Sequence, residues 1–187
     1  IRVSGSELVG LVPLQAMLDA GRHYLKKQER SCGISEAEII KIAVKSLGLD
    51  ELKPFNPKEK IIEYILDDDS KSPLINMNLT EFADETASES PAPGGGSISA
   101  YMGSLGISLA TMVANLSSHK RGWDERWEEF SEWAEKGQYY KTALLKSVDE
   151  DTDAFNKIMT AFGLPKSNNE EKTARNQAIQ DATKNAI

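Results

Sequence analysis

The chain has 187 residues and a formal net charge of −7, so it is long enough for one domain with a core and too acidic for the basic surface that nucleic-acid binding requires. Its single cysteine, Cys32, excludes an internal disulfide, and with only two histidines beside it there is no zinc or haem spacing, so we expect no metal. The sequence begins without the charged and apolar regions of a signal peptide, which, like the single cysteine, favours a reducing cytoplasm.

The first quarter of the chain predicts a short strand followed by two helices. The segment "IRVS" (residues 1–4) has the composition of a strand end, and Pro13 suits an early position in a helix with one apolar face. A capping box in "SEAE" (residues 35–38) opens the second helix, and Gly48 is placed to end it.

A third helix leads to a domain boundary. Asn and Pro at residues 56–57 begin this helix, and the acidic residues 67–69 should end it because carboxylates are unfavourable at a helix C-terminus. The polar, proline-containing stretch "DDDSKSPLINMN" (residues 67–78) follows, and its composition is typical of a boundary between domains.

The second half of the chain predicts helices only. A capping box at Asn78 begins a short helix, and residues 123–162 carry one apolar stripe of a long helix that Gly137 bends or divides. A cap at Ser167 begins a final helix. Because no alternating apolar run follows residue 30, the predicted architecture is mostly helical.

Residues 98–116 form a run of nineteen without a charge, which is nearly long enough to cross a membrane. Glycine, serine and threonine make the run only weakly hydrophobic, so we predict a buried bundle helix and no membrane span. Its small residues lie on one side, and its larger apolar residues lie on the other: Ile98, Met102, Leu105, Leu109, Met112 and Leu116.

Three glycines precede that helix and leave its first amides uncovered by side chains. Free amides at Gly94, Gly95 and Gly96, together with the helix dipole, attract a carboxylate or a phosphate, and Ser97 adds a cap or a hydroxyl donor. Taken alone, the glycines favour a plain loop over a ligand site.

The acidic cluster "SVDEDTDAF" (residues 147–155) places one carboxylate on the apolar side of the long helix. The stripe that runs through Val148 and Phe155 includes Asp151, whereas the acids at 149, 150 and 153 fall on a solvated face. A carboxylate on the core side is a candidate for a raised pKa and for acid/base work. The residues alone favour a plainer role, in which Asp151 pairs with a cation or caps a neighbouring helix.

Three cationic or titratable residues follow the small-residue helix. His119 is more typical of a surface cap than of a catalyst. Lys120 and Arg121 are placed either to neutralise an acidic ligand or to compensate the helix dipole, and the sequence leaves both readings open.

Several stretches together resemble the formimidoyltransferase-cyclodeaminase family of histidine breakdown, in the same order and at similar intervals. They are "SGSELVGLVPLQAMLDAG" (4–21), "LGLDELKPFNPKEKIIEYIL" (47–66), "SPAPGGGSISAYMGSLGISLATMVANLS" (90–117) and "VDEDTDAF" (148–155). The glycine motif and its helix are also similar to methenyltetrahydrofolate cyclohydrolases.

The resemblance implies a piece of a longer protein with a mainly α fold. Residues 1–30 correspond to the strand and helix that end an α/β formimidoyltransferase domain, residues 31–75 to a helical linker, and residues 76–187 to the N-terminal part of a helical cyclodeaminase bundle. The family's catalytic transferase histidine lies outside this chain, so neither histidine here takes that role.

The resemblance also implies a reaction, the ring closure of 5-formimidoyltetrahydrofolate to 5,10-methenyltetrahydrofolate with loss of ammonia. Asp151 matches the family's acid/base residue, and Gly94–Ser97 would bind the substrate through backbone amides. From charge, Lys120 or Arg121 would meet its glutamate carboxylates. No tightly bound cofactor is implied beyond the tetrahydrofolate substrate.

The resemblance further implies a homo-oligomer formed through pairing of cyclodeaminase domains. Two alternatives remain: a methenyltetrahydrofolate cyclohydrolase, and a non-catalytic helical module for oligomerisation.

Overall fold

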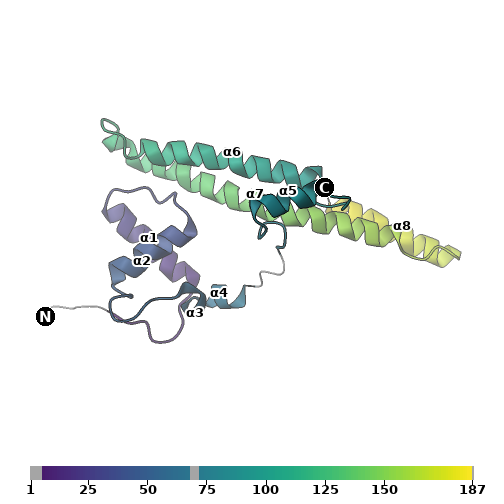
Figure 1. Cartoon of the computed structure of the whole chain (residues 1–187), viewed down its shortest axis with the longest axis horizontal. Coiled ribbons are helices and arrows are strands. Elements are labelled where there is room, and N and C mark those ends of the chain that lie inside the picture. The colour runs from purple at the N-terminus through teal and green to yellow at the C-terminus, as the bar shows by residue number, and fades with distance from the viewer. Residues whose placement is uncertain (1–5, 68–71, 187) are drawn as a thin grey trace. The chain divides into compact units, whose positions relative to one another are not determined.

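The computed structural model describes residues 6–67 and 72–186, and within them the chain is mainly α-helical (Figure 1). The helices are α1 (Leu14–Lys27), α2 (Glu36–Leu47), α3 (Pro57–Lys60), α4 (Ile62–Leu66), α5 (Leu79–Thr86), α6 (Gly95–Ser117), α7 (Trp127–Phe162) and α8 (Asn169–Asn185). The predicted mainly α fold is therefore confirmed. The strand expected at residues 1–4 lies outside the described residues.

The chain divides into two compact units, and the division cuts through α6 and α7. Within the described residues, unit 1 consists of 6–67 and 106–141, and unit 2 consists of 72–105 and 142–186. The candidate site predicted at residues 94–97 and 151 lies in unit 2, whereas residues 119–121 lie in unit 1.

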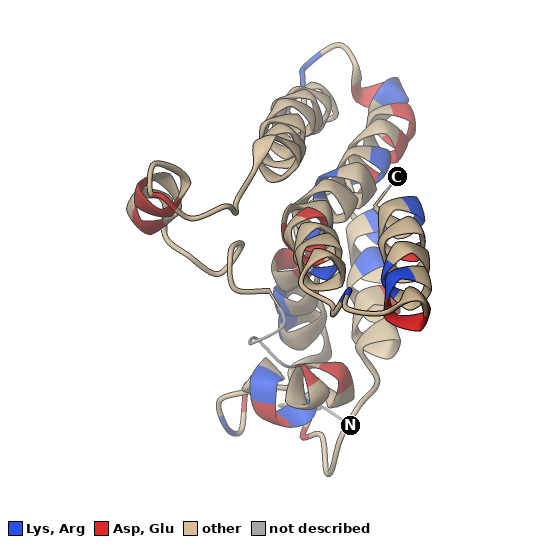
Figure 2. Cartoon of the chain, turned by 90° about the vertical axis from the view of Figure 1, so that its right-hand side faces the viewer, with Lys and Arg blue, Asp and Glu red and all other residues tan. Residues whose placement is uncertain are grey.

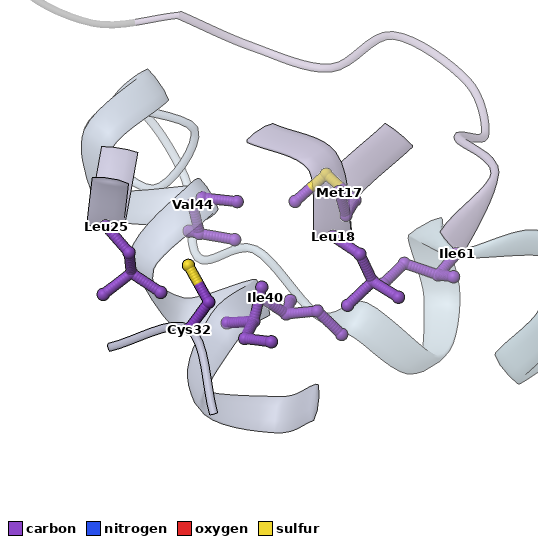
Figure 3. Packing of buried hydrophobic residues seen from close by; sticks show 9 residues of the cluster. Met17, Leu18, Leu25, Cys32, Ile40, Val44 and Ile61 are labelled. Atoms are coloured by element: carbon purple, nitrogen blue, oxygen red, sulfur yellow. The ribbon is translucent and has the colours of Figure 1, made fainter. Parts of the chain in front are cut away.

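Unit 1 has a hydrophobic core between α1 and α2 (Figure 3). Gly21 of α1 is buried against α2, where an added β-carbon would overlap the backbone of Ile39, so the two helices approach closely. The core side chains come from both helices and from the segments around them: Met17, Leu18, Leu25, Cys32, Ile39, Ile40, Ala43, Val44 and Ile61. This core therefore includes residues from both sides of the domain boundary that was predicted after residue 30.

The helix ends in unit 1 follow local sequence signals, with one exception. Ser35 Oγ accepts a hydrogen bond from the Glu38 amide, and Gly48 ends α2 in a left-handed conformation with φ of 66°. The single helix predicted after Asn56 is wrong, because Ile61 is extended and separates α3 from α4. Ile61 forms a parallel β-bridge with Val12, and that tertiary contact outweighs the local helical preference.

The loop before α2 is fixed to the parts of α6 and α7 in unit 1. The Gly33 carbonyl accepts hydrogen bonds from Asn115 Nδ2 at 2.7 Å and from Gln138 Nε2 at 3.0 Å. Helix α7 continues without a break through Gly137, so this glycine does not divide the helix, which was one of the two predicted effects. Its absent side chain instead leaves room for Thr111 of α6, so this glycine serves close helix packing.

The buried and exposed faces of α6 differ from those of an ordinary amphipathic helix. Its buried stripe consists of small hydroxyl residues seven positions apart, Ser97, Ser104 and Thr111, and Ser118 continues this spacing one residue beyond the end of the helix. Its larger apolar side chains are exposed, with Met102 at 66%, Leu109 at 62% and Leu116 at 68%. The sequence correctly separated the two sides, but the prediction of a buried bundle helix is wrong for the apolar side within the described residues.

The charge distribution sets α6 apart from its neighbours. Figure 2 shows charged residues on the other helices, of both signs or acidic only, whereas α6 carries none. By length and composition alone α6 is apolar enough to cross a membrane, and 22% of its most apolar window is buried in the structure. Its small-residue face nevertheless contacts α7, which is charged along its length, so a bilayer is a poor match for this pair of helices.

The first and last helices of unit 2 both begin with a side-chain cap. Asn78 and Glu81 form the predicted capping box of α5. The last helix begins one residue later than predicted, because the side chain of Asn168 accepts the Glu171 amide at 2.8 Å. The Ser167 amide instead donates a hydrogen bond to the Glu171 carboxylate, so Ser167 contacts the first turn of α8 without being its cap.

Candidate functional site

The glycine-rich segment that precedes α6 leads directly to a carboxylate on α7. Helix α6 begins at Gly95, and the Gly94 carbonyl accepts the first helical hydrogen bond, from the Ile98 amide at 3.1 Å. Ser97, in the first turn, has no solvent exposure. Because Ser97 faces α7, the contacts made by this residue define how the two helices meet in unit 2.

Ser97 uses both its amide and its hydroxyl to contact α7. The amide donates to Asp151 Oδ2 at 2.9 Å. The hydroxyl lies 2.8 Å from the Val148 carbonyl oxygen and 3.1 Å from the same Asp151 oxygen, and it has a single proton to share between them. The Thr152 hydroxyl lies 3.2 Å from Ser97 Oγ and completes the cluster.

Asp151 is held by one oxygen and open at the other. Both donors from Ser97 reach Oδ2, and among the described residues Oδ1 has no hydrogen-bond partner. The residue as a whole is exposed. A carboxylate beside the first turn of a helix is favoured by the helix dipole, so the arrangement has the geometry of a cap supplied by a neighbouring helix and also presents a free oxygen to a ligand.

The three glycines have different surroundings. A β-carbon on Gly96 would overlap the Asp151 carboxylate, so this position requires glycine if the carboxylate is to approach. A β-carbon on Gly94 or Gly95 would meet nothing within 4 Å. The backbone before α6 is therefore open on one side and in contact with Asp151 on the other.

The structure brings together only part of the predicted set. Gly96, Ser97 and Asp151 form one cluster, with Gly94 and Gly95 next to it in the chain. Lys120 and Arg121 follow the opposite end of α6 and belong to unit 1. Both are exposed, and Lys120 Nζ lies 4.6 Å from the centre of the Trp123 ring. That cation–π contact gives Lys120 a structural partner in the turn between α6 and α7.

Asp149 is a buried acidic residue that the sequence placed on a solvated face, and that prediction is wrong. It is 7% exposed, and its carboxylate accepts the amides of Leu74 at 2.8 Å and Ile75 at 3.2 Å. The periodicity of α7 gives no sign of this role. The signal that was available is the turn at residues 73–77, whose backbone donors need acceptors.

The described residues contain no group of three or more His, Cys, Asp or Glu side chains placed to hold a metal ion. The carboxylates of Asp149 and Asp151 are occupied in whole or in part by backbone amides. The chemistry that the cluster itself offers is proton transfer by the Asp151 carboxylate, one oxygen of which accepts no hydrogen bond among the described residues.

Comparisons with known proteins cover nearly the whole chain. A family model described as the formiminotransferase domain matches residues 1–67, and one described as formiminotransferase-cyclodeaminase matches residues 78–187. The chain is 38% identical over 186 residues to a formimidoyltransferase-cyclodeaminase from Rattus norvegicus and 40% identical to one from Gallus gallus. These alignments include 99% of this chain and 34% of each relative, so the chain spans about a third of their length.

A shorter relative aligns with a little over half of the chain. A methenyltetrahydrofolate cyclohydrolase from Methylorubrum extorquens is 38% identical over 111 residues, which is 59% of this chain and 53% of that protein. The aligned length is close to that of the range 78–187, which the formiminotransferase-cyclodeaminase model matches.

Proposed function

Because the chain belongs to the formiminotransferase-cyclodeaminase family, we propose that the cluster of Gly94–Ser97 and Asp151 serves the closure of a tetrahydrofolate ring. The proposed substrate is 5-formimidoyltetrahydrofolate, and the products are 5,10-methenyltetrahydrofolate and ammonia. The observation that carries this proposal is the carboxylate of Asp151, an exposed residue in which one oxygen is fixed by Ser97 and the other accepts no hydrogen bond among the described residues.

The proposed reaction moves one proton between two nitrogens and takes up a second proton from solvent. N10 of the substrate attacks the amidine carbon and forms the new carbon–nitrogen bond, and Asp151 accepts the proton that N10 loses. The same carboxyl group then gives this proton to the former imino nitrogen, which also takes a proton from solvent and leaves as ammonia when its bond to carbon breaks, so that the methenyl product carries a positive charge. We propose Oδ1 for both transfers, because Oδ2 lies within hydrogen-bond distance of the Ser97 amide and hydroxyl.

The roles of the glycines and of Ser97 follow from their contacts. The amides of Gly94, Gly95 and Gly96 are proposed to bind the substrate, because open space surrounds the first two. Ser97 was predicted as a substrate ligand, but its amide and hydroxyl are occupied by acceptors on α7. We therefore assign Ser97 the role of orienting Asp151. The proposed contact of Lys120 or Arg121 with glutamate carboxylates rests on charge alone.

The test is turnover of 5-formimidoyltetrahydrofolate by the chain and two variants, followed by absorbance of the methenyl product and by ammonia release. Asp151→Asn removes the base and should lower the rate by a factor of about 100 or more. Asp153→Asn is the matched control, because Asp153 is exposed on the same helix. Equal rates in both variants would exclude Asp151 as the catalyst.

The same assay separates the two alternatives. Hydrolysis of 5,10-methenyltetrahydrofolate without any ammonia-releasing reaction would favour a cyclohydrolase, which the relative from Methylorubrum extorquens supports. Absence of either reaction in the unaltered chain would favour the helical assembly module. A parent glutamate formimidoyltransferase activity is proposed from the family match at residues 1–67.

Self-association is proposed from the exposed apolar face of α6, which we define as Met102, Leu105, Leu109, Met112, Val113 and Leu116. Each of these side chains is at least half exposed, and they recur at three- and four-residue spacing on one helix. A contiguous apolar surface of this kind is typical of an interface. Pairing of two chains through this face is compatible with the catalytic proposal.

The division into domains at 1–30, 31–75 and 76–187 and the cytoplasmic location stay predictions. The two matched family ranges leave residues 68–77 between them. This interval falls inside the stretch 67–78, which composition marked as a boundary.

A further inference from the structure

Unit 1 contains a cavity of about 460 Å³ that the proposed reaction does not use. Its walls come from the loop before α2, from the second half of α6 and from the first half of α7. The lining residues that matter chemically are Arg30, Ser31, Asn115, His119, Gln138 and Lys141. All of them belong to unit 1, so the cavity is defined within one compact body.

The charges around the cavity are of one sign. Arg30, His119 and Lys141 line it, and none of the lining residues is acidic. Among the described residues, the side chains of Arg30 and His119 have no hydrogen-bond or ion-pair partner. The chain as a whole has a net charge of −7, whereas this cavity is lined by two permanent cations and an imidazole, so the local charge is opposite to the net charge.

The polar groups behind these cations are already fixed to one another. Ser31 Oγ donates to Asn115 Oδ1 at 2.7 Å, and Asn115 Nδ2 donates to the Gly33 carbonyl at 2.7 Å. Lys141 Nζ lies 2.7 Å from Gln138 Oε1, while Gln138 Nε2 donates to the same carbonyl of Gly33. These hydrogen bonds connect the loop before α2 with α6 and α7. The walls of the cavity are therefore already in place before a ligand binds.

The remaining lining gives the cavity an apolar side. Ile34, Met112 and Leu116 contribute aliphatic and thioether groups next to the cationic ones. A site with cations on one side and apolar groups on another suits an anion that carries a carbon skeleton or several negative groups close together.

We propose that this cavity binds a small polyvalent anion of the carboxylate or phosphate class, with Arg30 and Lys141 as the charged donors and His119 as a further lining group. Lys120 and Arg121 do not line the cavity and are not part of this site. The proposal is independent of the proposed reaction, because it uses no residue of the Gly94–Ser97 and Asp151 cluster.

Calorimetric titration of the chain with citrate and, separately, with inorganic pyrophosphate tests the site. We expect one equivalent of at least one probe to bind, and the stronger of the two identifies the class of anion. Arg30→Gln and Lys141→Gln should each weaken binding by at least fivefold, because each removes a charge-assisted hydrogen bond. Lys136→Gln is the matched control: Lys136 lies on α7 in the same unit and does not line the cavity.

Location is tested by nuclear magnetic resonance. Each probe should shift the side-chain amide signals of Asn115 and Gln138, and thermal melting should show that the variants remain folded. Failure of both probes to bind at millimolar concentration would overturn the proposal. So would equal weakening by Lys136→Gln, or shifts confined to residues 94–97, since these results would indicate general charge attraction or binding at the other cluster.

Discussion

At the scale of single residues, Gly96 decides whether the carboxylate of α7 can reach the first turn of α6. The position lies within a helix, where glycine is normally less favourable than alanine by about 1 kcal/mol. Its presence is explained by Asp151, whose carboxylate occupies the space of a β-carbon. The cost of glycine in the helix is offset by the hydrogen bonds that Ser97 then makes.

Gly96→Ala should therefore destabilise the chain by about 1–3 kcal/mol, because the new methyl group forces Asp151 or the start of α6 to move. It should also lower the turnover proposed for this cluster. The measurement is the urea midpoint of unfolding together with the product assay. Gly106→Ala is the control: its β-carbon would meet nothing within 4 Å, so this change should be neutral or stabilising by up to about 1 kcal/mol. Equal effects of the two changes would contradict this explanation.

Cys32 gives a second residue-scale prediction, which concerns pH. Burial raises the pKa of this thiol above its ordinary value of 9.0, and the nearby charge of Glu135 raises the pKa further. A folded-state pKa above the unfolded one stabilises the fold fully at pH values below 9.0, and this contribution is lost as the pH rises through the raised value. Unfolding free energy should thus fall on the alkaline side.

Cys32→Ala removes this titration, so its unfolding free energy should fall less steeply than that of the unaltered chain between about pH 8 and pH 10.5. The smaller side chain of the variant also lowers the unfolding free energy by an amount that does not depend on pH. The comparison therefore uses the slopes of unfolding free energy against pH and not the values themselves. Urea titrations at a series of pH values provide the measurement. Parallel slopes in the two proteins would show that the thiol makes no contribution in this range.

At the scale of helices, α7 acts on two other segments through acids two residues apart. Asp151 reaches the start of α6, while Asp149 binds the turn that precedes α5. Residues two apart on a helix point in different directions, so one stretch of α7 can hold two segments at once. The turn at residues 73–77 is thereby attached to the helix that carries the proposed catalytic residue.

Asp149→Asn should destabilise the chain by about 1.5–3 kcal/mol, because an amide nitrogen replaces an acceptor of two buried backbone donors. In this variant, hydrogen exchange at the Leu74 and Ile75 amides should be faster than in the unaltered chain, whereas exchange at the amides of α2 should change less. Glu150→Gln is the matched control, since Glu150 pairs with Lys146 on the surface, where such pairs contribute about 1 kcal/mol or less. Unchanged exchange at Leu74 and Ile75 would contradict the proposed attachment.

The sequence predicted the features of these helices that depend on neighbouring residues. The αL glycine at Gly48 and the capping box at Asn78 rest on contacts within four residues, and both are confirmed. Of the capping box predicted at residues 35–38, the Ser35 cap is present, whereas the Glu38 carboxylate pairs with Lys41. The break at Ile61 and the burial of Asp149 could not be predicted in this way, because each depends on a partner more than forty residues distant.

The two faces of α6 show a different limit of sequence reasoning. Periodicity separates small residues from large apolar ones, but it does not say which set contacts the rest of the chain. Burial of hydroxyl residues lets the backbones of α6 and α7 approach closely, as the contact between Thr111 and Gly137 shows. For the candidate site, helical spacing selected Asp151, whereas the contact of Ser97 with it required the packed helices.

At the scale of the whole molecule, the chain combines an acidic composition with an uncharged helix that presents the apolar face of α6. Mean hydropathy is −0.43, so the chain is polar on average and the apolar surface is a local feature. The proposed pairing of chains would remove this surface from water while the charged helices remain hydrated.

The chain should accordingly associate in a concentration-dependent manner when it is measured by size-exclusion chromatography with light scattering. Leu109→Glu places a charge in the centre of the apolar face of α6, and we expect it to weaken association by about tenfold or more. Val9→Glu is the control, because Val9 is 90% exposed and lies outside that face. A monomer at every concentration, or equal weakening by the control, would contradict the proposed interface.

The stripe of Ser97, Ser104, Thr111 and Ser118 has a consequence for how this region tolerates insertions and deletions. Because its members are separated by seven residues, they lie on one side of the helix. Ser97 therefore faces the Asp151 carboxylate only while the number of residues in the helix is unchanged. One residue added inside α6 would rotate everything before it by about 100° and turn Ser97 away from Asp151. One residue added to the turn at 119–123 would leave both helices in register. Lengthening should therefore be accommodated in that turn and rejected within the helix.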